Sequence, residues 1–291
     1  VLSPQEELVS ERLEALYRLT APTGGADVLL TSAVTASQRL SPVSYIGANT
    51  FFFHQGEQIS LTTLQKRLAA AGYANVKQVL AAGEFAVRGS IVDVFPMGSE
   101  RPFRLDFFDD EIESIRWFDV DTQRSMESAE EIRLLPGHEF PVDPEALLAF
   151  RQRWRREFAG DPKKSIVYCD IEKEILPPGI EYYLPLFFDE TAALTDYLPP
   201  NARVFLLGDI EAALQAFGRD MASHYKVLAA DPQRPALAPE RIWLKPEEFF
   251  KSLANFARFT VEEKENAEDL KRLTGIEVDR KSQNPVGKLL E

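Results

Sequence analysis

Residues 83–124, GEFAVRGSIVDVFPMGSERPFRLDFFDDEIESIRWFDVDTQR, decide the fold of this 291-residue chain. Short runs of apolar, β-branched and aromatic residues alternate with polar ones, and Pro, Gly or Asp residues separate the runs. Such runs are typical of β-strands joined by tight turns. We expect strands at residues 85–88, 91–95, 103–108 and 112–118.

The strand expected at 103–108 places two chemically different sets of side chains on opposite faces, because successive residues of a strand point in opposite directions. Its odd-numbered residues are all apolar, which predicts a core face. The other set is Arg104, Asp106 and Phe108, so an aromatic ring lies among charges on the face expected to meet water. Arg88 joins this set if its strand lies close by.

An exposed Phe108 beside Arg88 and Arg104 has the composition of a protein-binding hot spot, because guanidinium groups bind carboxylates while the ring fills a pocket. The alternative is that Phe108 covers a second small core and that the arginines are only solvated. The strand pattern alone leaves both interpretations open.

The same stretch resembles a segment shared by two bacterial DNA-repair families, the transcription-repair coupling factors and UvrB, a subunit of the excision nuclease. The resemblance rests on Gly-x-Phe-x-x-Arg-Gly, Asp-x-Phe-Pro, Arg-x-Asp-Phe-Phe-x-Asp-Glu-Ile and Phe-Asp, spread across the whole stretch. It implies a β-rich domain on which UvrA, the damage-recognition ATPase of nucleotide excision repair, docks. It also implies that Arg88, Arg104 and Phe108 contact UvrA, with Asp106 on the same face.

The composition bounds the class of protein. With 45% hydrophobic and 11% aromatic residues, the chain can form packed cores. It shows no bilayer-spanning run and no signal peptide, so we expect no membrane association and a cytoplasmic location. The single cysteine, Cys169, cannot form an intramolecular disulfide and is expected to be a buried thiol at a strand end.

The net charge of −13 argues against a chain that binds nucleic acid by itself, since phosphate binding requires Lys and Arg side chains. An acidic member of a DNA-repair family is expected to recruit partners instead. Because the sequence begins at Val1 without an initiator Met, we interpret it as a fragment of a longer protein.

The fold class follows from the resemblance: a partial RecA-like, P-loop-type α/β domain with an inserted β-rich α+β domain that binds UvrA. Residues 1–45 would be the truncated end of the first RecA-like subdomain, and 46–136 the UvrA-binding domain. Residues 137–260 would form a UvrB-like α/β subdomain, and 261–291 a charged tail or linker helix.

Hydrophobic periodicity and capping residues place further elements along the chain. Ser3 and Asp143 are expected helix N-caps, and Gly72 an expected helix end. Helices are expected at residues 4–18, 32–40, 61–71, 143–158, 209–218 and 246–256. Strands are expected at residues 27–31, 51–54, 130–135, 203–207 and 242–244.

ATP hydrolysis is the first catalytic hypothesis. The chain contains no G-x-x-x-x-G-K-[ST] phosphate loop. The segment VFLLGDIE resembles the place where UvrB carries Asp-Glu, but here Asp209 is followed by Ile210. This degenerate motif matches the coupling-factor branch and implies no catalytic residue and no cofactor in this fragment, with ATP and Mg²⁺ in a downstream motor of the parent protein.

Other chemistries have less support. Asp106, Asp109, Asp110 and Glu111 could hold Mg²⁺ or Mn²⁺ in a hydrolase, but turns favour Asp on their own account. No Cys or His pair has zinc spacing, so we expect no metal site. An arginine cluster late in the 143–158 helix could contact DNA or a partner, or be a solvated helix end; it consists of Arg151, Arg153, Arg155 and Arg156.

The sequence therefore predicts a non-catalytic N-terminal module of the coupling-factor family that recruits UvrA to lesions where RNA polymerase is stalled. The parent protein would displace the polymerase by ATP-driven translocation, and other domains would bind RNA polymerase and double-stranded DNA. The alternative is a UvrB-like excinuclease subunit with nucleotide-dependent DNA binding.

Overall fold

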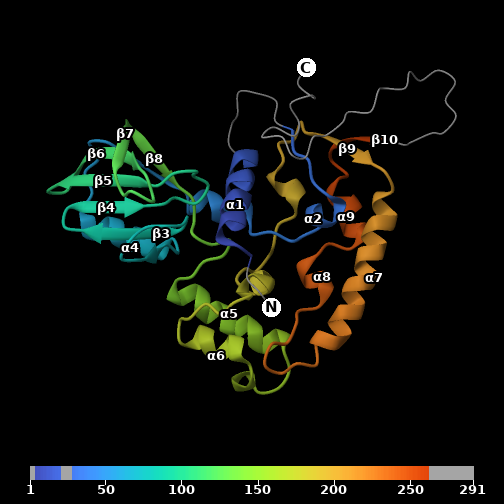
Figure 1. The fold of residues 1–291 in the computed structure, drawn as a ribbon. Coiled ribbons are helices and arrows are strands. Elements are labelled where there is room, and N and C mark those ends of the chain that lie inside the picture. The colour runs from blue at the N-terminus through green and yellow to red at the C-terminus, as the bar shows by residue number, and fades with distance from the viewer. Residues whose placement is uncertain (1–3, 21–27, 262–291) are drawn as a thin grey trace, which may run out of the picture.

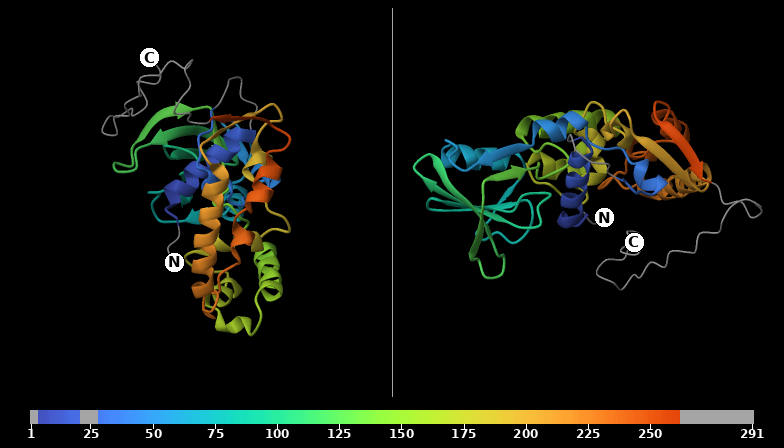
Figure 2. Two further views of the ribbon diagram at one scale, coloured as in Figure 1. Left: turned by 90° about the vertical axis from the view of Figure 1, so that its right-hand side faces the viewer. Right: turned by 90° about the horizontal axis from the view of Figure 1, so that it is seen from above.

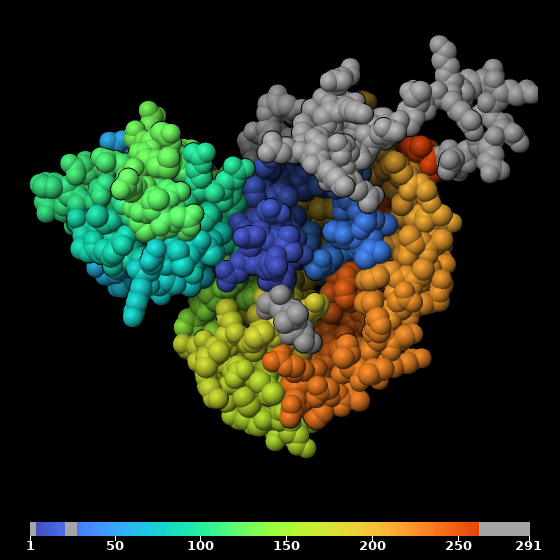
Figure 3. All heavy atoms as spheres, in the orientation of Figure 1, coloured from blue at the N-terminus to red at the C-terminus, as the bar shows by residue number. Residues whose placement is uncertain are grey.

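A six-stranded sheet forms a lobe at one end of the molecule, and the remainder is mostly helical (Figure 1). The computed structural model describes residues 4–20 and 28–261. The lobe extends sideways from the helical part when the molecule is seen from above (Figure 2), and it projects from one side in the space-filling view (Figure 3). The lobe therefore presents a large surface of its own.

The six strands follow the order β2-β3-β4-β5-β6-β7. β2 runs parallel to β3, and all other neighbours are antiparallel. The strands expected in the deciding stretch are confirmed, whereas the edge strand β7 was not predicted. The strands are β2 (Ala74–Asn75), β3 (Glu84–Arg88), β4 (Ile91–Val94), β5 (Phe103–Phe108), β6 (Glu111–Phe118) and β7 (Ser125–Ala129).

The inner face of this sheet is apolar and packs against helix α4 (Leu61–Ala70). The odd-numbered residues of β5 are all buried, as the alternation predicts. Leu64 and Leu68 of α4 belong to the same core. Ser60 caps the start of α4, and Gly72 follows its end with a φ of 89°, a left-handed conformation that suits glycine.

The lobe connects to the remainder through two paired strands. β1 (Phe51–His54) and β8 (Glu131–Leu134) form a separate antiparallel two-stranded sheet, so the chain enters and leaves the lobe side by side. Helix α1 (Glu6–Thr20) contributes Leu13 and Leu16 to the lobe's core. Helix α3 (Val43–Ala48) leads into β1.

A second core lies below the lobe, around α5 (Pro144–Glu157) and α6 (Ile166–Glu172) (Figure 1). Asp143 caps α5 as expected, by accepting hydrogen bonds from two backbone N–H groups. The prediction that Cys169 ends a strand is wrong. It lies half-buried inside α6, because Ser165 caps a helix at the start of that apolar run. The 3₁₀ segments are η1 (Pro162–Lys164), η2 (Ile180–Leu186) and η3 (Leu194–Tyr197).

A third, smaller core is formed where α2, α7 and α9 meet β9, which pairs in parallel with β10. The strand expected at 203–207 is present, but it alternates between exposed and half-buried residues and is not buried. β10 was not predicted. The elements are α2 (Ala33–Ala36), β9 (Arg203–Leu207), α7 (Ile210–Leu228), α8 (Pro239–Ile242), α9 (Pro246–Ser252) and β10 (Ala257–Val261).

Several other predictions fail or fall outside the described residues. No strand forms over 28–31, where Val28 and Leu30 are 93% and 88% exposed, and Asp27 is not described. The strand expected at 242–244 is reduced to one bridge between Trp243 and Gln38. Helix α1 begins at Glu6, after Pro4, and the expected cap Ser3 is not described.

Residues 262–291 of the expected tail also lie outside the described part. Among the residues that are described, none of the helices combines the length and apolarity needed to cross a bilayer.

Candidate protein interface on the outer face of the six-stranded sheet

Strand register brings the predicted residues to one face of the sheet, opposite the main core. Arg88 on β3 lies opposite Ile91 on β4, and Ile91 lies opposite Asp106 on β5. Directly opposed residues point to the same face. Arg104 and Phe108 lie two residues before and after Asp106 and share its direction. We call this surface, defined by these five residues, the outer face.

Phe108 is the exposed apolar residue of the outer face. Its side chain is 68% exposed at the end of β5, where Asp109 adopts a φ of 51° in the turn to β6. Two hydrogen bonds hold this turn: Ile59 N–H donates to Asp110 O at 2.7 Å, and Gln58 Nε2 donates to a Glu111 carboxylate oxygen at 2.7 Å. The ring is therefore presented on an anchored turn.

The same side of the sheet carries a second small core next to the outer face, but Phe108 lies outside this core. Val79, Ala86 and Phe118 are buried together there, with Val76 and Phe95 packed against them. The interpretation in which Phe108 covers a second small core is therefore wrong. One half of the outer side of the sheet is covered, and the half that carries Phe108 is open.

A buried carboxylate, which the sequence analysis missed, organises the two arginines. Asp93 on β4 is 1% exposed. Its carboxylate accepts hydrogen bonds from Arg104 Nε at 2.7 Å and Nη2 at 2.9 Å, and from Arg88 Nη2. Arg88 and Arg104 thus converge on one buried anion, and the interpretation of both as merely solvated side chains is wrong.

Arg104 is almost fully used by the fold. Its side chain is 13% exposed, and Nη1 donates to Gln123 O and Ser125 Oγ, both at 3.1 Å. Its guanidinium carbon lies 4.9 Å from the centre of the Phe118 ring. The hydrogen bonds to Asp93 raise the pKa of Arg104, against the opposing effect of burial. Arg104 therefore ties β4, β5 and the turn before β7 together.

Arg88 is placed differently. Its side chain is 48% exposed, and one of its terminal nitrogens is bound to Asp93. A guanidinium group carries five N–H donors in a planar fork. Arg88 therefore keeps most of its donors for an external acceptor while Asp93 fixes its orientation.

Asp106 contributes a partly exposed negative charge to the same face. It accepts a hydrogen bond from Ser114 Oγ at 2.9 Å, across the β5–β6 ladder. In the described ranges of the chain, no group of three or more His, Cys, Asp and Glu side chains is arranged to hold a metal ion.

The remaining candidate residues lie elsewhere. Asp209 caps α7, its Oδ1 accepting a hydrogen bond from Ala212 N–H at 2.9 Å. In the arginine cluster, Arg151 lies 3.8 Å from Glu172, and Arg153 pairs with Asp189 at 2.6 Å. At least part of that cluster is thus neutralised by neighbouring carboxylates.

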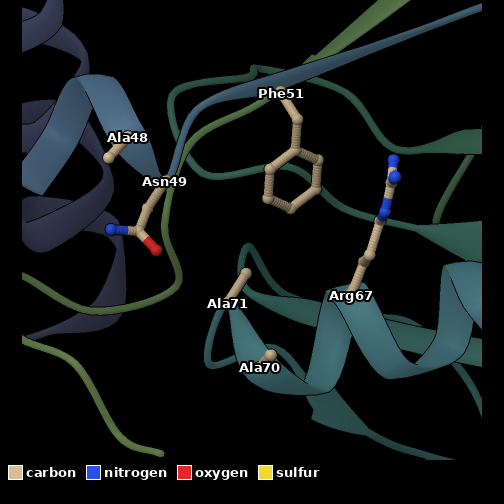
Figure 4. Close-up of a pocket in the computed structure, with 6 residues that line it drawn as sticks. All are labelled: Ala48, Asn49, Phe51, Arg67, Ala70 and Ala71. Atoms are coloured by element: carbon tan, nitrogen blue, oxygen red, sulfur yellow. The ribbon is translucent and has the colours of Figure 1, made fainter. Parts of the chain in front are cut away.

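A cavity of about 250 Å³ lies at the base of the lobe, between the α3–β1 connection and the end of α4 (Figure 4). Phe51 and Arg67 flank this space, and none of the outer-face residues lines it. Its walls are otherwise small and uncharged, which gives it little to bind a ligand with. The lining residues are Ala48, Asn49, Phe51, Arg67, Ala70 and Ala71.

Comparison with known proteins identifies the lobe. Residues 51–140 match the family model of the UvrB interaction domain. This range is similar to the UvrB interaction domain. The match covers the whole ladder from β1 to β8, and it agrees with the resemblance seen in residues 83–124.

The chain around the UvrB interaction domain also has clear relatives. It is 42% identical over 257 residues to the transcription-repair-coupling factor of Escherichia coli K12, covering 88% of this chain and 22% of that protein. The corresponding protein of Haemophilus influenzae is 42% identical over 261 residues, and that of Bacillus subtilis 32% over 222 residues. The chain spans about a fifth of the length of these curated relatives, 22%, 22% and 18% respectively.

Proposed function

We propose that the outer face of the UvrB interaction domain binds UvrA, and that the chain recruits UvrA to lesions where RNA polymerase is stalled. The observation that carries this proposal is the exposed Phe108 ring on its anchored turn, on the same face of the sheet as an Arg88 held by a buried anion. Aromatic and arginine side chains dominate binding energy at protein interfaces. A rigid presentation also lowers the entropy lost on association.

We expect the residues of the outer face to have different roles in binding UvrA. Phe108 would fill an apolar pocket on UvrA, and Arg88 would bind an acidic group beside that pocket with its remaining donors. Asp93 and Arg104 would not contact UvrA and would only hold the outer face in place, because their charged groups are hydrogen-bonded to each other. Asp106 would select against acidic surfaces placed on its side of the face.

The test is the affinity of purified UvrA for the chain and for two variants, measured by biolayer interferometry. We expect Phe108→Ala to weaken binding by about 30-fold or more, since such anchors contribute about 2 kcal/mol. Arg88→Ala should weaken it less. Phe52→Ala is the matched control, because Phe52 is a 41% exposed ring on β1 of the same domain.

The outcomes separate two errors. If wild-type chain and UvrA do not associate, recruitment is the wrong function. If the wild type binds and Phe108→Ala binds equally well, the function stands and the outer face is the wrong site. Circular dichroism melting of each variant establishes that the fold is unchanged.

We further propose that the parent protein displaces stalled RNA polymerase by ATP-driven translocation on double-stranded DNA, in the cytoplasm, and that this chain serves it as a non-catalytic platform. ATP and Mg²⁺ would bind to a downstream motor. The local role of Asp209 as a helix cap agrees with this view, its Oδ1 accepting a hydrogen bond from Ala212 N–H.

The proposed RecA-like character rests on β9, α7 and β10. Two parallel strands joined by a helical crossover are the repeating unit of α/β folds, and here α7, α8 and α9 lie between β9 and β10. We propose that this unit is part of a RecA-like sheet with more strands in the intact protein.

The alternative function is UvrB-like, nucleotide-dependent DNA binding. Calorimetric titration with ATP, with and without Mg²⁺, tests it directly. Tight ATP binding by this chain would contradict a non-catalytic platform, whereas heats indistinguishable from dilution would agree with it.

A further inference from the structure

A cavity of about 320 Å³ opens far along the chain from the outer face, between the C-terminal half of α7, segment η2 and residues 234–243. This volume lies at the lower end of the range typical of small-ligand sites. Its walls combine aliphatic and aromatic side chains, with Tyr182, Tyr225 and Trp243 among the aromatic ones. None of the outer-face residues contributes to it.

The aromatic walls are held in place by contacts outside the cavity. Tyr183 donates its hydroxyl hydrogen bond to Pro235 O at 2.9 Å, and burial raises the pKa of its phenol to about 12. The Trp243 ring packs edge-to-face on Phe217 with a centroid separation of 5.2 Å. These rings therefore form fixed apolar walls, while Tyr182 remains 47% exposed.

Arg234 brings a permanent positive charge to this largely apolar cavity, which His224 also lines. Arg234 donates from Nη1 to Pro178 O at 2.9 Å, which fixes the plane of its guanidinium group. Among the residues that the structure describes, no carboxylate lies within 4.0 Å of Arg234 as an ion-pair partner. The nearby Asp231 accepts its hydrogen bond from Gln233 N–H at 2.9 Å. Arg234 thus retains donors for another acceptor.

We propose that this cavity binds an aromatic group that carries a carboxylate. The ring would lie against the tyrosine and Trp243 walls, and the carboxylate would accept hydrogen bonds from the free edge of Arg234, a planar fork suited to that anion. The net charge of −13 disfavours general anion binding, so this recognition would be local. The carboxylate could belong to a small aromatic acid or to a protein segment with an aromatic residue beside an acidic one.

The test uses the chain labelled with 5-fluorotryptophan and followed by ¹⁹F NMR. The sequence has three tryptophans, of which Trp243 lines the cavity while Trp117 lies on β6 and Trp154 is buried in α5. Titration with naphthalene-2-acetic acid should shift the Trp243 resonance and leave that of Trp117 in place, while Trp154, whose ring lies 5.2 Å from the cavity-lining Tyr183, is not used as a reference. Naphthalene-2-acetamide, which lacks the charge, should bind about tenfold more weakly.

Two variants isolate the carboxylate contact from the cavity. Arg234→Ala should remove the preference for the acid over the amide, while Ala236→Phe should fill the cavity and weaken both ligands. An unshifted Trp117 resonance and an unchanged circular dichroism melt of each variant show that the fold is intact. An unchanged preference in Arg234→Ala, or no Trp243 shift with millimolar acid, would overturn the proposal.

A second pair of probes identifies the source of the carboxylate. A capped peptide with adjacent Phe and Glu is compared with its Phe-Gln counterpart under the same conditions. Tighter binding of the Phe-Glu peptide than of the naphthyl acid assigns the cavity to a protein segment. The reverse order assigns it to a small acid, and binding of neither probe excludes the proposed class.

Discussion

Two of the sheets, the six-stranded sheet and the β9–β10 pair, expose apolar side chains in different ways. On the six-stranded sheet, Phe108 is an isolated ring among charged residues, and the opposite face of that sheet is closed by a complete core. On the β9–β10 pair, Phe205 and Phe259 stack with centroids 5.0 Å apart. Leu207 and Val261 beside them are 62% and 50% exposed.

The difference teaches how to distinguish an interface from an unfinished core. Parallel strands are normally covered on both faces, so a two-stranded parallel sheet with a bare apolar side calls for further structure from the same protein. A single ring on a rigid antiparallel sheet needs no such cover and suits a transient partner. Exposure alone does not separate the two cases.

The largest expected effect tests the rigidity of the outer face. Arg104→Ala leaves the buried Asp93 with only Arg88 as a partner, and breaking a buried ion pair typically costs about 3 kcal/mol or more of unfolding free energy. Urea denaturation followed by circular dichroism measures this cost. Arg116→Ala is the control, because Arg116 is exposed and lies opposite Arg104 on β6.

The control should change the unfolding free energy by no more than about 0.5 kcal/mol. Equal stabilities of the two variants would show that the outer face does not depend on the Asp93 centre. The result also matters for binding studies, since weaker UvrA binding by Arg104→Ala would then report loss of order in the outer face and not loss of a direct contact.

A smaller effect on stability is expected from a substitution on the β9–β10 pair. Phe205→Thr removes a 56% exposed ring whose stacking on Phe259 contributes about 1 kcal/mol. Because β9–β10 carries a contiguous apolar surface, this variant should also reduce binding of the dye ANS, measured by fluorescence. Phe108→Thr should leave dye binding almost unchanged. A larger loss of dye binding in Phe108→Thr would reverse our distinction between the two surfaces.

The smallest effect concerns the junction between the lobe and the helical part. His138 is half-buried there, stacked on Phe140 at 5.4 Å, and desolvation lowers the pKa of its imidazole below the ordinary value. In mild acid, His138 is therefore protonated more readily in the unfolded chain than in the folded chain. Stability from this group is complete above the unfolded pKa of about 6.5 and is lost as the pH falls below it.

Urea midpoints measured from pH 7.5 to 5.5 should decline less steeply in His138→Gln than in the wild type. His224→Gln, which replaces an exposed histidine, is the control and should retain the wild-type decline. A His138→Gln profile parallel to the wild type would show that another group governs the acid sensitivity.

The sequence predicted most reliably what depends on neighbouring residues alone. Alternation along 103–108 placed Phe108 in solvent, because the direction of a side chain in a strand follows from its position. Gly72 and Asp143 likewise marked the end of α4 and the start of α5, because helix capping depends on the residues at the helix terminus. The role of Asp93 depends on which residues of three strands lie opposite each other, and a single sequence does not fix that register.

Other failures have their own physical causes. β7 is an exposed edge strand whose sequence, SMESA, has no apolar alternation to reveal it. The apolar runs at 28–30 and around Cys169 were both predicted as strand, because runs this short do not distinguish a strand from a helix or an exposed segment. The first is exposed and the second is a capped helix.

The pairing of β1 with β8 affects how readily such a domain can be transferred from one protein to another. Because Phe51 lies opposite Leu134, both ends of the lobe emerge at the same place. The lobe can therefore be inserted into a single loop of another protein, because its two ends are close enough to join the two sides of that loop. Recombination could exchange such a cassette between unrelated scaffolds without redesign of either.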